Sequence, residues 1–166
     1  MILNEKVHIE NHNPNWQRDF VDEIKMLKNK PHLTTLAFEH IGSTSIPNIK
    51  AKPIIDIIIG ADSFPPERMI IKEIEECGYT YMKEMSVSDR LYFIKRGLKN
   101  FNLHLIAYKG DVWEKDILFR DYMIKHPEKA QAYSSLKEQI IINGIDTLLE
   151  YSEKKAEFFS EMRRDM

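Results

Sequence analysis

The sequence contains one cysteine and no long run of hydrophobic residues. Cys77 follows acidic residues in EIEECGYT, which would raise rather than lower the pKa of its thiol, so we expect a packing role rather than a nucleophile. No apolar stretch is long enough to span a bilayer, and the first residues, MILNEKVHIE, lack the basic start and long apolar core of a signal peptide. We therefore expect a cytoplasmic protein without a membrane partner.

Internal repeats, low-complexity segments and linkers rich in proline or glycine are also absent from the sequence. We expect a single domain over residues 1–166, and a chain of this length buries ~70% of its unfolded surface without needing a disulfide or a structural metal. The net charge of -2 gives no general attraction for nucleic acid, although a local basic patch could bind phosphates. We do not expect a nucleic-acid partner, and the residues predict no particular oligomeric state.

The order of hydrophobic patterns predicts an α+β fold, with a mixed β-sheet covered by helices on one side. A helical third follows the sheet, so we divide the domain into a sheet core, residues 1–110, and helices packed on it, residues 111–166. Helices are expected over residues 16–28 and 68–77 and from residue 113 onward, and strands over residues 36–41, 54–59, 79–82, 91–96 and 101–108.

Asp56 stands out because it lies within IIDIII, a run typical of a strand inside a sheet. Alternation along this strand puts Ile55, Ile57 and Ile59 on one face and Asp56 on the other. As a metal ligand, Asp56 would carry a charge that is unfavourable until a cation arrives, and Asp56→Asn would not destabilise the metal-free protein. As a structural residue, it would be bonded to backbone or to a basic side chain, and the same substitution would cost ~3 to 5 kcal/mol.

The loop before this strand contains the sequence GSTS and two lysines. Gly42 can bring the backbone close to a ligand, while Ser43, Thr44 and Ser45 provide hydroxyl groups and consecutive N–H groups of the kind that hold phosphate oxygens. Lys52 adds positive charge. An ordinary helix cap followed by a turn would use the same residue types.

Several segments resemble the GrpB family of bacterial proteins: EHIGSTSIP, KPIIDI, LHLI, LFRDYMIKHPEKAQAYSSLK and YSEKKAEFF, in this order and across nearly the whole chain. The resemblance implies a nucleotidyltransferase-type fold of the DNA polymerase β superfamily. Within it, Gly42 and Ser43 would match the Gly-Ser signature, and Asp56 would match the first acid of an aspartate-x-aspartate pair. Ile58 stands where the second acid would be, so the usual site for two Mg²⁺ ions, which two carboxylates bridge, is incomplete.

Other residues could complete a metal site beside Asp56. Glu39 and His40 point to opposite faces of their strand, so only one of them can share the cleft with Asp56. With His104, His40 would give two imidazoles and a carboxylate, which suit Mn²⁺, Fe²⁺ or Zn²⁺; Glu39 would instead restore a carboxylate pair. Either histidine could also be a buried, hydrogen-bonded strand residue.

Basic residues further along the chain favour a phosphate-bearing ligand. Arg96 could face a phosphate at the GSTS turn if its side of the strand faces the cleft, and Arg120 could reach the same place or pair with Asp121 or Asp116. Most of the aromatic residues of the last third are expected to be core: Trp113, Phe119, Tyr122, Tyr133, Phe158 and Phe159.

Our first hypothesis from the sequence is an enzyme that transfers a nucleotidyl or phosphoryl group with a divalent metal, Mg²⁺ or Mn²⁺. In this hypothesis the GSTS turn, Lys52, Arg96 and Arg120 bind phosphate, and Asp56 and His104 are catalytic. The second hypothesis is a module that binds a nucleotide or phosphorylated metabolite without turnover, and the third is a protein-interaction domain.

Overall fold

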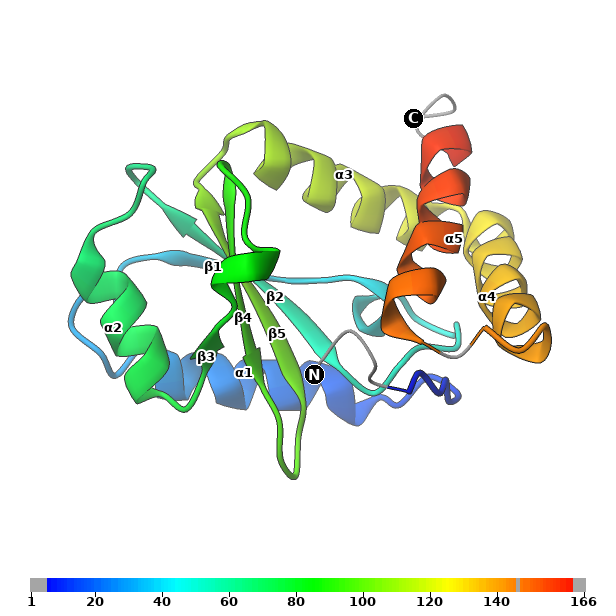
Figure 1. The fold of residues 1–166 in the computed structure, drawn as a ribbon, viewed down its shortest axis with the longest axis horizontal. Helices are drawn as coiled ribbons and strands as arrows, with labels where there is room; N and C mark the ends of the chain where they lie inside the picture. The colour runs from blue at the N-terminus through cyan, green and yellow to red at the C-terminus, as the bar shows by residue number, and fades with distance from the viewer. Residues whose placement is uncertain (1–5, 146, 163–166) are drawn as a thin grey trace.

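The computed structural model describes residues 6–145 and 147–162 (Figure 1). The prediction of an α+β fold with a helical last third is confirmed. The elements are α1 (Asn15–Leu27), β1 (Ala37–Ile41), the 3-10 turn η2 (Ser43–Ser45), β2 (Ile55–Ala61), α2 (Arg68–Glu76), β3 (Thr80–Tyr81), the 3-10 turn η3 (Lys83–Met85), β4 (Arg90–Lys95), β5 (Phe101–Ala107), α3 (Asp111–Lys125), α4 (Pro127–Ile142) and α5 (Leu148–Met162). Within the described residues, no helix is both long and apolar enough to cross a membrane.

The five strands form one mixed sheet in the order β1-β2-β5-β4-β3. Its central pair, β2 and β5, is parallel, and the other neighbouring strands are antiparallel. The parallel register sets Asp56 opposite Asn102 and Ile58 opposite His104. Because directly paired residues share a face of the sheet, these four side chains lie on the same side.

The opposite face of the sheet carries the main hydrophobic core. Ile57, Ile59, Leu103 and Leu105 are fully buried there. They pack with apolar side chains of α1 and α2, which give the two helices their amphipathic spacing: Trp16, Phe20, Leu27, Ile70 and Ile74. The alternation predicted for β2 is therefore confirmed.

The face that carries Asp56 is covered in part by α3, so helices lie on both sides of the sheet rather than on one side as expected. Trp113 of α3 packs there against Ile41, Ile58 and Ile106. Figure 1 shows α3 on the side of the sheet opposite α1. Burial of apolar side chains on both faces is the reason that the central strands are hydrophobic nearly throughout.

The last two helices pack mainly over the connection between β1 and β2. Ile46 and Ile49 of that connection are buried against Ala130 and Tyr133 of α4, and Phe159 of α5 packs against the same cluster. Figure 1 shows α4 and α5 together at the end of the molecule away from α2. This packing brings residues of the last third close to the turn that precedes Asp56.

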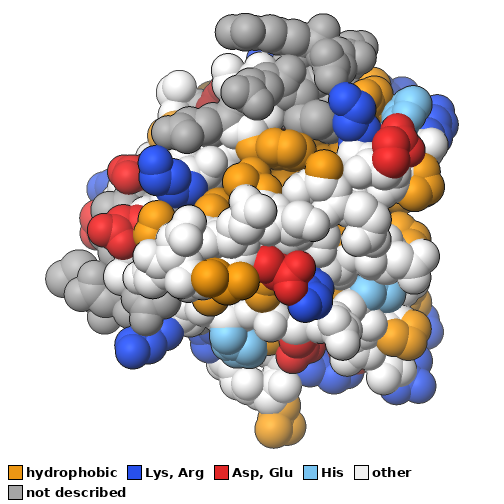
Figure 2. All heavy atoms as spheres, turned by 90° about the vertical axis from the view of Figure 1, so that its right-hand side faces the viewer, with side chains coloured by type: hydrophobic (Ala, Val, Ile, Leu, Met, Phe, Trp, Pro, Cys, Tyr) orange, Lys and Arg blue, Asp and Glu red, His pale blue; other side chains and the backbone are white. Residues whose placement is uncertain are grey.

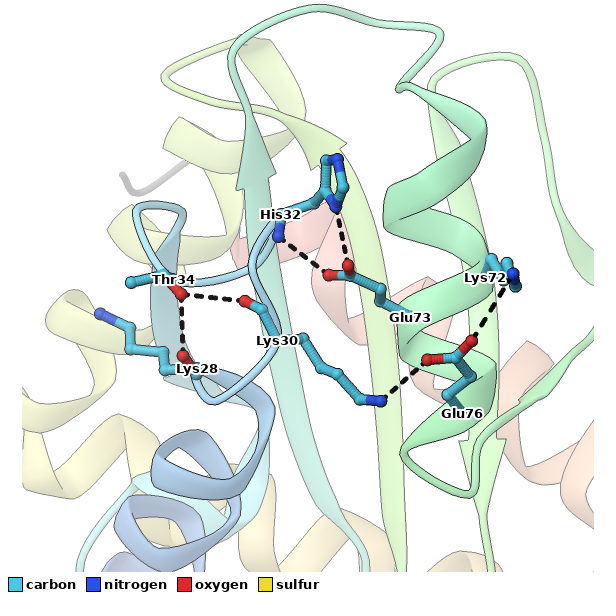
Figure 3. Close-up of polar contacts among 7 residues, drawn as sticks. All are labelled: Lys28, Lys30, His32, Thr34, Lys72, Glu73 and Glu76. Carbon is cyan, nitrogen blue, oxygen red and sulfur yellow. Dashed lines mark hydrogen bonds and ion pairs between the residues drawn. The ribbon is translucent and has the colours of Figure 1, made fainter.

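The segment between α1 and β1 is tied to α2 by polar contacts (Figure 3). The backbone N–H of His32 donates to Glu73 Oε2 at 2.9 Å, and His32 Nδ1 lies 2.7 Å from Glu73 Oε1. Glu73 is buried, whereas the Lys30–Glu76 pair beside it is partly exposed. Both glutamates therefore link α2 to the segment between α1 and β1, Glu73 in buried surroundings and Glu76 in contact with solvent.

We expect Glu73→Ala to lower the free energy of unfolding by about 1 to 2 kcal/mol, because it leaves a partly buried N–H of His32 without its acceptor. The matched control, Glu76→Ala, should cost clearly less than Glu73→Ala, since exposed ion pairs contribute little. Urea unfolding of both variants measures the difference. Equal losses would show that burial of Glu73 does not strengthen its contacts.

Candidate functional site

Asp56 lies at the start of β2 with about a quarter of its side chain (27%) exposed. Asn102 Nδ2 donates a hydrogen bond of 2.9 Å to Asp56 Oδ1, and His104 Nε2 lies 3.8 Å from the same oxygen. Burial alone would raise the pKa of Asp56, but His104, the charge of Lys52 and the Asn102 bond outweigh it and lower the pKa to about 2. The folded protein therefore stabilises this carboxylate, which favours a structural role for Asp56; its role as a metal ligand stays a prediction.

Gly42 makes room for the carboxylate of Asp56. Its backbone has φ +72° and ψ -174°, a region that residues with a side chain rarely adopt. A Cβ atom at this position would lie 2.5 Å from Asp56 Oδ2. The backbone of Gly42 therefore approaches Asp56 closely, and its approach to a ligand stays a prediction.

The hydroxyl groups of the turn η2 have different roles. Thr44 is buried, and its Oγ1 lies 2.9 Å from His40 Nε2. Ser45 Oγ donates to the carbonyl of Gly42 at 2.6 Å, which closes the turn. Ser43 Oγ lies 3.5 Å from Tyr133 Oη, at the outer limit of a hydrogen bond. Of the three, Ser43 has the hydroxyl that the fold uses least.

The strand register decides between Glu39 and His40. Glu39 pairs with Ile58 and so shares the face of Asp56, whereas His40 points into the main core. There His40 stacks on Phe20 at 4.9 Å between ring centroids, and burial lowers its pKa to about 4, which keeps the imidazole neutral. The structure does not bring His40 together with Asp56 as a metal ligand.

Arginines account for two further predicted site residues. Arg120 Nη1 donates to Glu39 Oε2 at 2.6 Å, so the two side chains form an ion pair with each other. Arg96 Nη2 donates to Asn102 Oδ1 at 3.0 Å. Neither arginine lines the cavity described below, and Arg96 acts through Asn102, whose amide it turns so that the NH₂ group faces Asp56.

His104 is oriented by a second arginine. Arg90 Nη1 lies 3.4 Å from His104 Nδ1, and Arg90 Nη2 donates to Asp116 Oδ2 at 2.8 Å. Because arginine only donates, Nδ1 is the acceptor and Nε2 carries the proton. His104 therefore faces Asp56 as a donor, and in this arrangement it is not placed to act as a general base.

These residues open onto a cavity of about 740 Å³ between the sheet and the C-terminal helices, which we call the Asp56 cavity. Lys115 and Ser152 are among its lining residues. Of the predicted site residues, it brings together Gly42, Ser43, Thr44, Lys52, Asp56 and His104. Further polar or charged groups in its wall are Arg90, Asn102, Asp116 and Lys155, and its aromatic residues are Tyr92, Phe119, Tyr133, Tyr151 and Phe159.

The sequence did not predict several of the lining residues. They lie on helices, and no local pattern links a helix residue to a site on a strand. Tyr133 was assigned to the core; it is buried, but its hydroxyl also points toward Ser43. Tyr151 and Lys155 lie in YSEKKAEFF, one of the segments that carried the family resemblance. The polar residues in those segments are the feature of the sequence that could have indicated these lining residues.

The residues around Asp56 do not fit a centre with two metal ions. Asp56 is one carboxylate, Asn102 presents its NH₂ group, and His104 presents an N–H, whereas such a centre needs carboxylates that bridge both ions. Asp116 lies in the same wall but is paired with Arg90. No group of three or more His, Cys, Asp or Glu residues suited to a metal ion occurs in residues 6–145 and 147–162.

Comparison with known proteins places this chain among bacterial relatives. The GrpB protein family model matches residues 6–165. The UPF0157 protein YqkA of Bacillus subtilis (strain 168) is 36% identical over 154 residues, which are 92% of this chain and 45% of that protein. The glutamate-rich protein GrpB of Alkalihalophilus pseudofirmus is 31% identical over 161 residues, which are 93% of this chain and 92% of that protein. This chain thus spans less than half of the Bacillus protein.

A solved structure shows the same relationship. The crystal structure of conserved protein GrpB from Enterococcus faecalis superposes with a TM-score of 0.82 and 30% identity, covering 95% of this chain and 96% of that chain. Terminal uridylyl transferase 4 from Trypanosoma brucei with bound GTP aligns with a TM-score of 0.48 and 13% identity, a likeness too distant to transfer a ligand. On its sequence and its fold, this chain belongs to the GrpB family.

Proposed function

We propose that this protein binds a nucleotide, or another small ligand that combines a planar ring with phosphate, in the Asp56 cavity. The observation that supports the proposal is the excess of positively charged side chains among the residues that line the cavity. Four lining residues are positively charged, against two carboxylates, in a chain whose net charge is -2. Positive charge concentrated in a concave site attracts an anion. The positively charged residues are Lys52, Arg90, Lys115 and Lys155.

The aromatic part of the wall supports a ligand with a planar ring. Five aromatic side chains line the cavity, and a ring can stack against such groups while phosphate oxygens meet the lysines. Figure 2 shows charges of both signs interspersed with hydrophobic side chains on the end of the molecule that carries α4 and α5. This mixed surface favours a small ligand inside the cavity over a nucleic acid on the outside.

Transfer of a nucleotidyl or phosphoryl group is the second candidate. It is favoured by the ionised Asp56 and by the match of Gly42 and Ser43 to the Gly-Ser signature of nucleotidyltransferases. The single carboxylate beside the turn favours binding without turnover. Release of pyrophosphate or phosphate from labelled nucleoside triphosphates, with Mg²⁺ or Mn²⁺ present, separates the two candidates.

A thermal-shift screen of nucleotides and of phosphorylated metabolites, with and without Mg²⁺ or Mn²⁺, tests the proposal. A ligand present at one hundred times its dissociation constant should stabilise the protein by about 2.7 kcal/mol. No shift with any compound would contradict the proposal and would favour a protein-interaction domain.

Ser43→Ala should weaken nucleotide binding about tenfold and leave the unliganded protein almost as stable as the parent, because the Ser43 hydroxyl makes one long contact. Thr44→Val is the matched control in the same turn. It should lower unliganded stability by about 1 to 2 kcal/mol, since it leaves the buried His40 Nε2 without its partner. Calorimetric titration and urea unfolding measure the two effects, and unchanged affinity in Ser43→Ala would remove the turn from the binding site.

A further inference from the structure

Three lysines from separate parts of the chain meet at two tyrosine rings beside the Asp56 cavity. Lys155 Nζ on α5 and Lys52 Nζ before β2 lie 4.9 Å and 5.8 Å from the ring centroid of Tyr151. Lys137 Nζ on α4 lies 4.4 Å from the ring centroid of Tyr133. We call these three residues the lysine cluster.

The innermost member of the lysine cluster is built into the protein interior. Lys137 is 1% exposed, and its ammonium donates to the backbone carbonyl of Lys50. Burial, then the charges of Lys155 and Lys52, lower its pKa to about 7. Like charges in a site of low dielectric raise each other's energy, and an anion placed among them would lower it.

Lys155, like Lys52, lines the cavity and lies close enough to Asp56 for their charges to interact. Burial lowers its pKa, and the charge of Asp56 partly offsets that effect. Lys155 and Lys52 both line the cavity and approach the same ring from α5 and from the segment before β2. Two ammonium groups from different elements therefore lie near the same ring in the cavity wall.

We propose that Lys52 and Lys155 hold a chain of at least two linked phosphates, so that the ligand is a nucleoside di- or triphosphate rather than a monophosphate. This inference rests on the proposed function. Adjacent phosphates present a separate charge to each ammonium, whereas one phosphate group has to be shared between them. Lys137 lies behind Tyr133, outside the cavity wall, and adds positive potential without touching the ligand.

Calorimetric titration of the full chain with inorganic orthophosphate, pyrophosphate and tripolyphosphate tests the inference without a substitution. We expect pyrophosphate to bind at least tenfold more tightly than orthophosphate. AMP, ADP and ATP form a second series, in which the step from AMP to ADP should raise the affinity by a similar factor. Equal affinities of orthophosphate and pyrophosphate, and of AMP and ADP, would overturn the inference.

Lys155→Met keeps most of the length of the side chain and removes its charge. It should weaken pyrophosphate and ADP binding at least tenfold and change AMP binding less. The matched control is Lys154→Met, a neighbouring exposed lysine that does not line the cavity, and it should leave all affinities unchanged. If AMP and ADP bind equally and Lys155→Met changes neither, the inference fails while the proposed function stands. If no nucleotide binds, both fail.

Discussion

Gly42→Ala should lower the free energy of unfolding by about 2 to 5 kcal/mol. The backbone at φ +72° and ψ -174° costs about 1 to 3 kcal/mol for a residue with a side chain. The new Cβ would also lie 2.5 Å from Asp56 Oδ2, so the carboxylate has to move away from Asn102 or the turn has to shift. Ligand binding should fall with stability, because both movements distort the wall of the cavity. Urea unfolding and calorimetric titration measure the two losses.

Two other glycines separate the causes of this effect. Gly144 also has positive φ, +82°, but a Cβ there would meet no atom within 4 Å, so Gly144→Ala reports the cost of a positive φ without a contact. Gly97 has neither feature, and Gly97→Ala should be nearly neutral. If Gly42→Ala lowers the free energy of unfolding no more than Gly144→Ala does, the carboxylate of Asp56 can move aside without cost, and the contact with Gly42 does not stabilise the turn.

Asp56→Asn should destabilise the unliganded protein by about 2 to 4 kcal/mol at neutral pH. The folded protein holds the pKa of Asp56 at about 2, below its ordinary value of 3.8. A depressed pKa means that the carboxylate contributes stability that is fully present above about pH 4 and is lost as the pH falls toward 2. The variant keeps one acceptor oxygen for Asn102 Nδ2, but it removes the charge and replaces the second carboxylate oxygen by an NH₂ group, which only donates.

The pH dependence provides the test of the Asp56 prediction. The difference in unfolding free energy between parent and Asp56→Asn should be constant from pH 7 to about pH 4 and should shrink below that. Asp62→Asn, at an exposed position just after β2, is the control and should change stability by less than about 0.5 kcal/mol. An Asp56→Asn variant as stable as the parent at pH 7 would contradict this prediction and would support Asp56 as a metal ligand whose charge is unfavourable without a cation.

Local patterns in the sequence determined the elements and the membership of the faces along each strand. Alternation in IIDIII separated Asp56 from Ile57 and Ile59, because the direction of side chains within one strand depends on that strand alone. The spacing of apolar residues predicted α1 and α2, because the faces of a helix also depend on that helix alone. The family resemblance was carried by segments spread over the chain, and the match over residues 6–165 confirms it.

Only the tertiary structure decided which side chains surround Asp56. The register of β1 against β2 put Glu39 rather than His40 on the face of Asp56, and register between strands is a property of their pairing. Packing of α4 and α5 over the segment before β2 brought Lys155 to the cavity and set Lys137 behind its wall. These contacts join residues about one hundred positions apart, so no local spacing in the sequence encodes them, and the charge of the site emerges only when the helices dock.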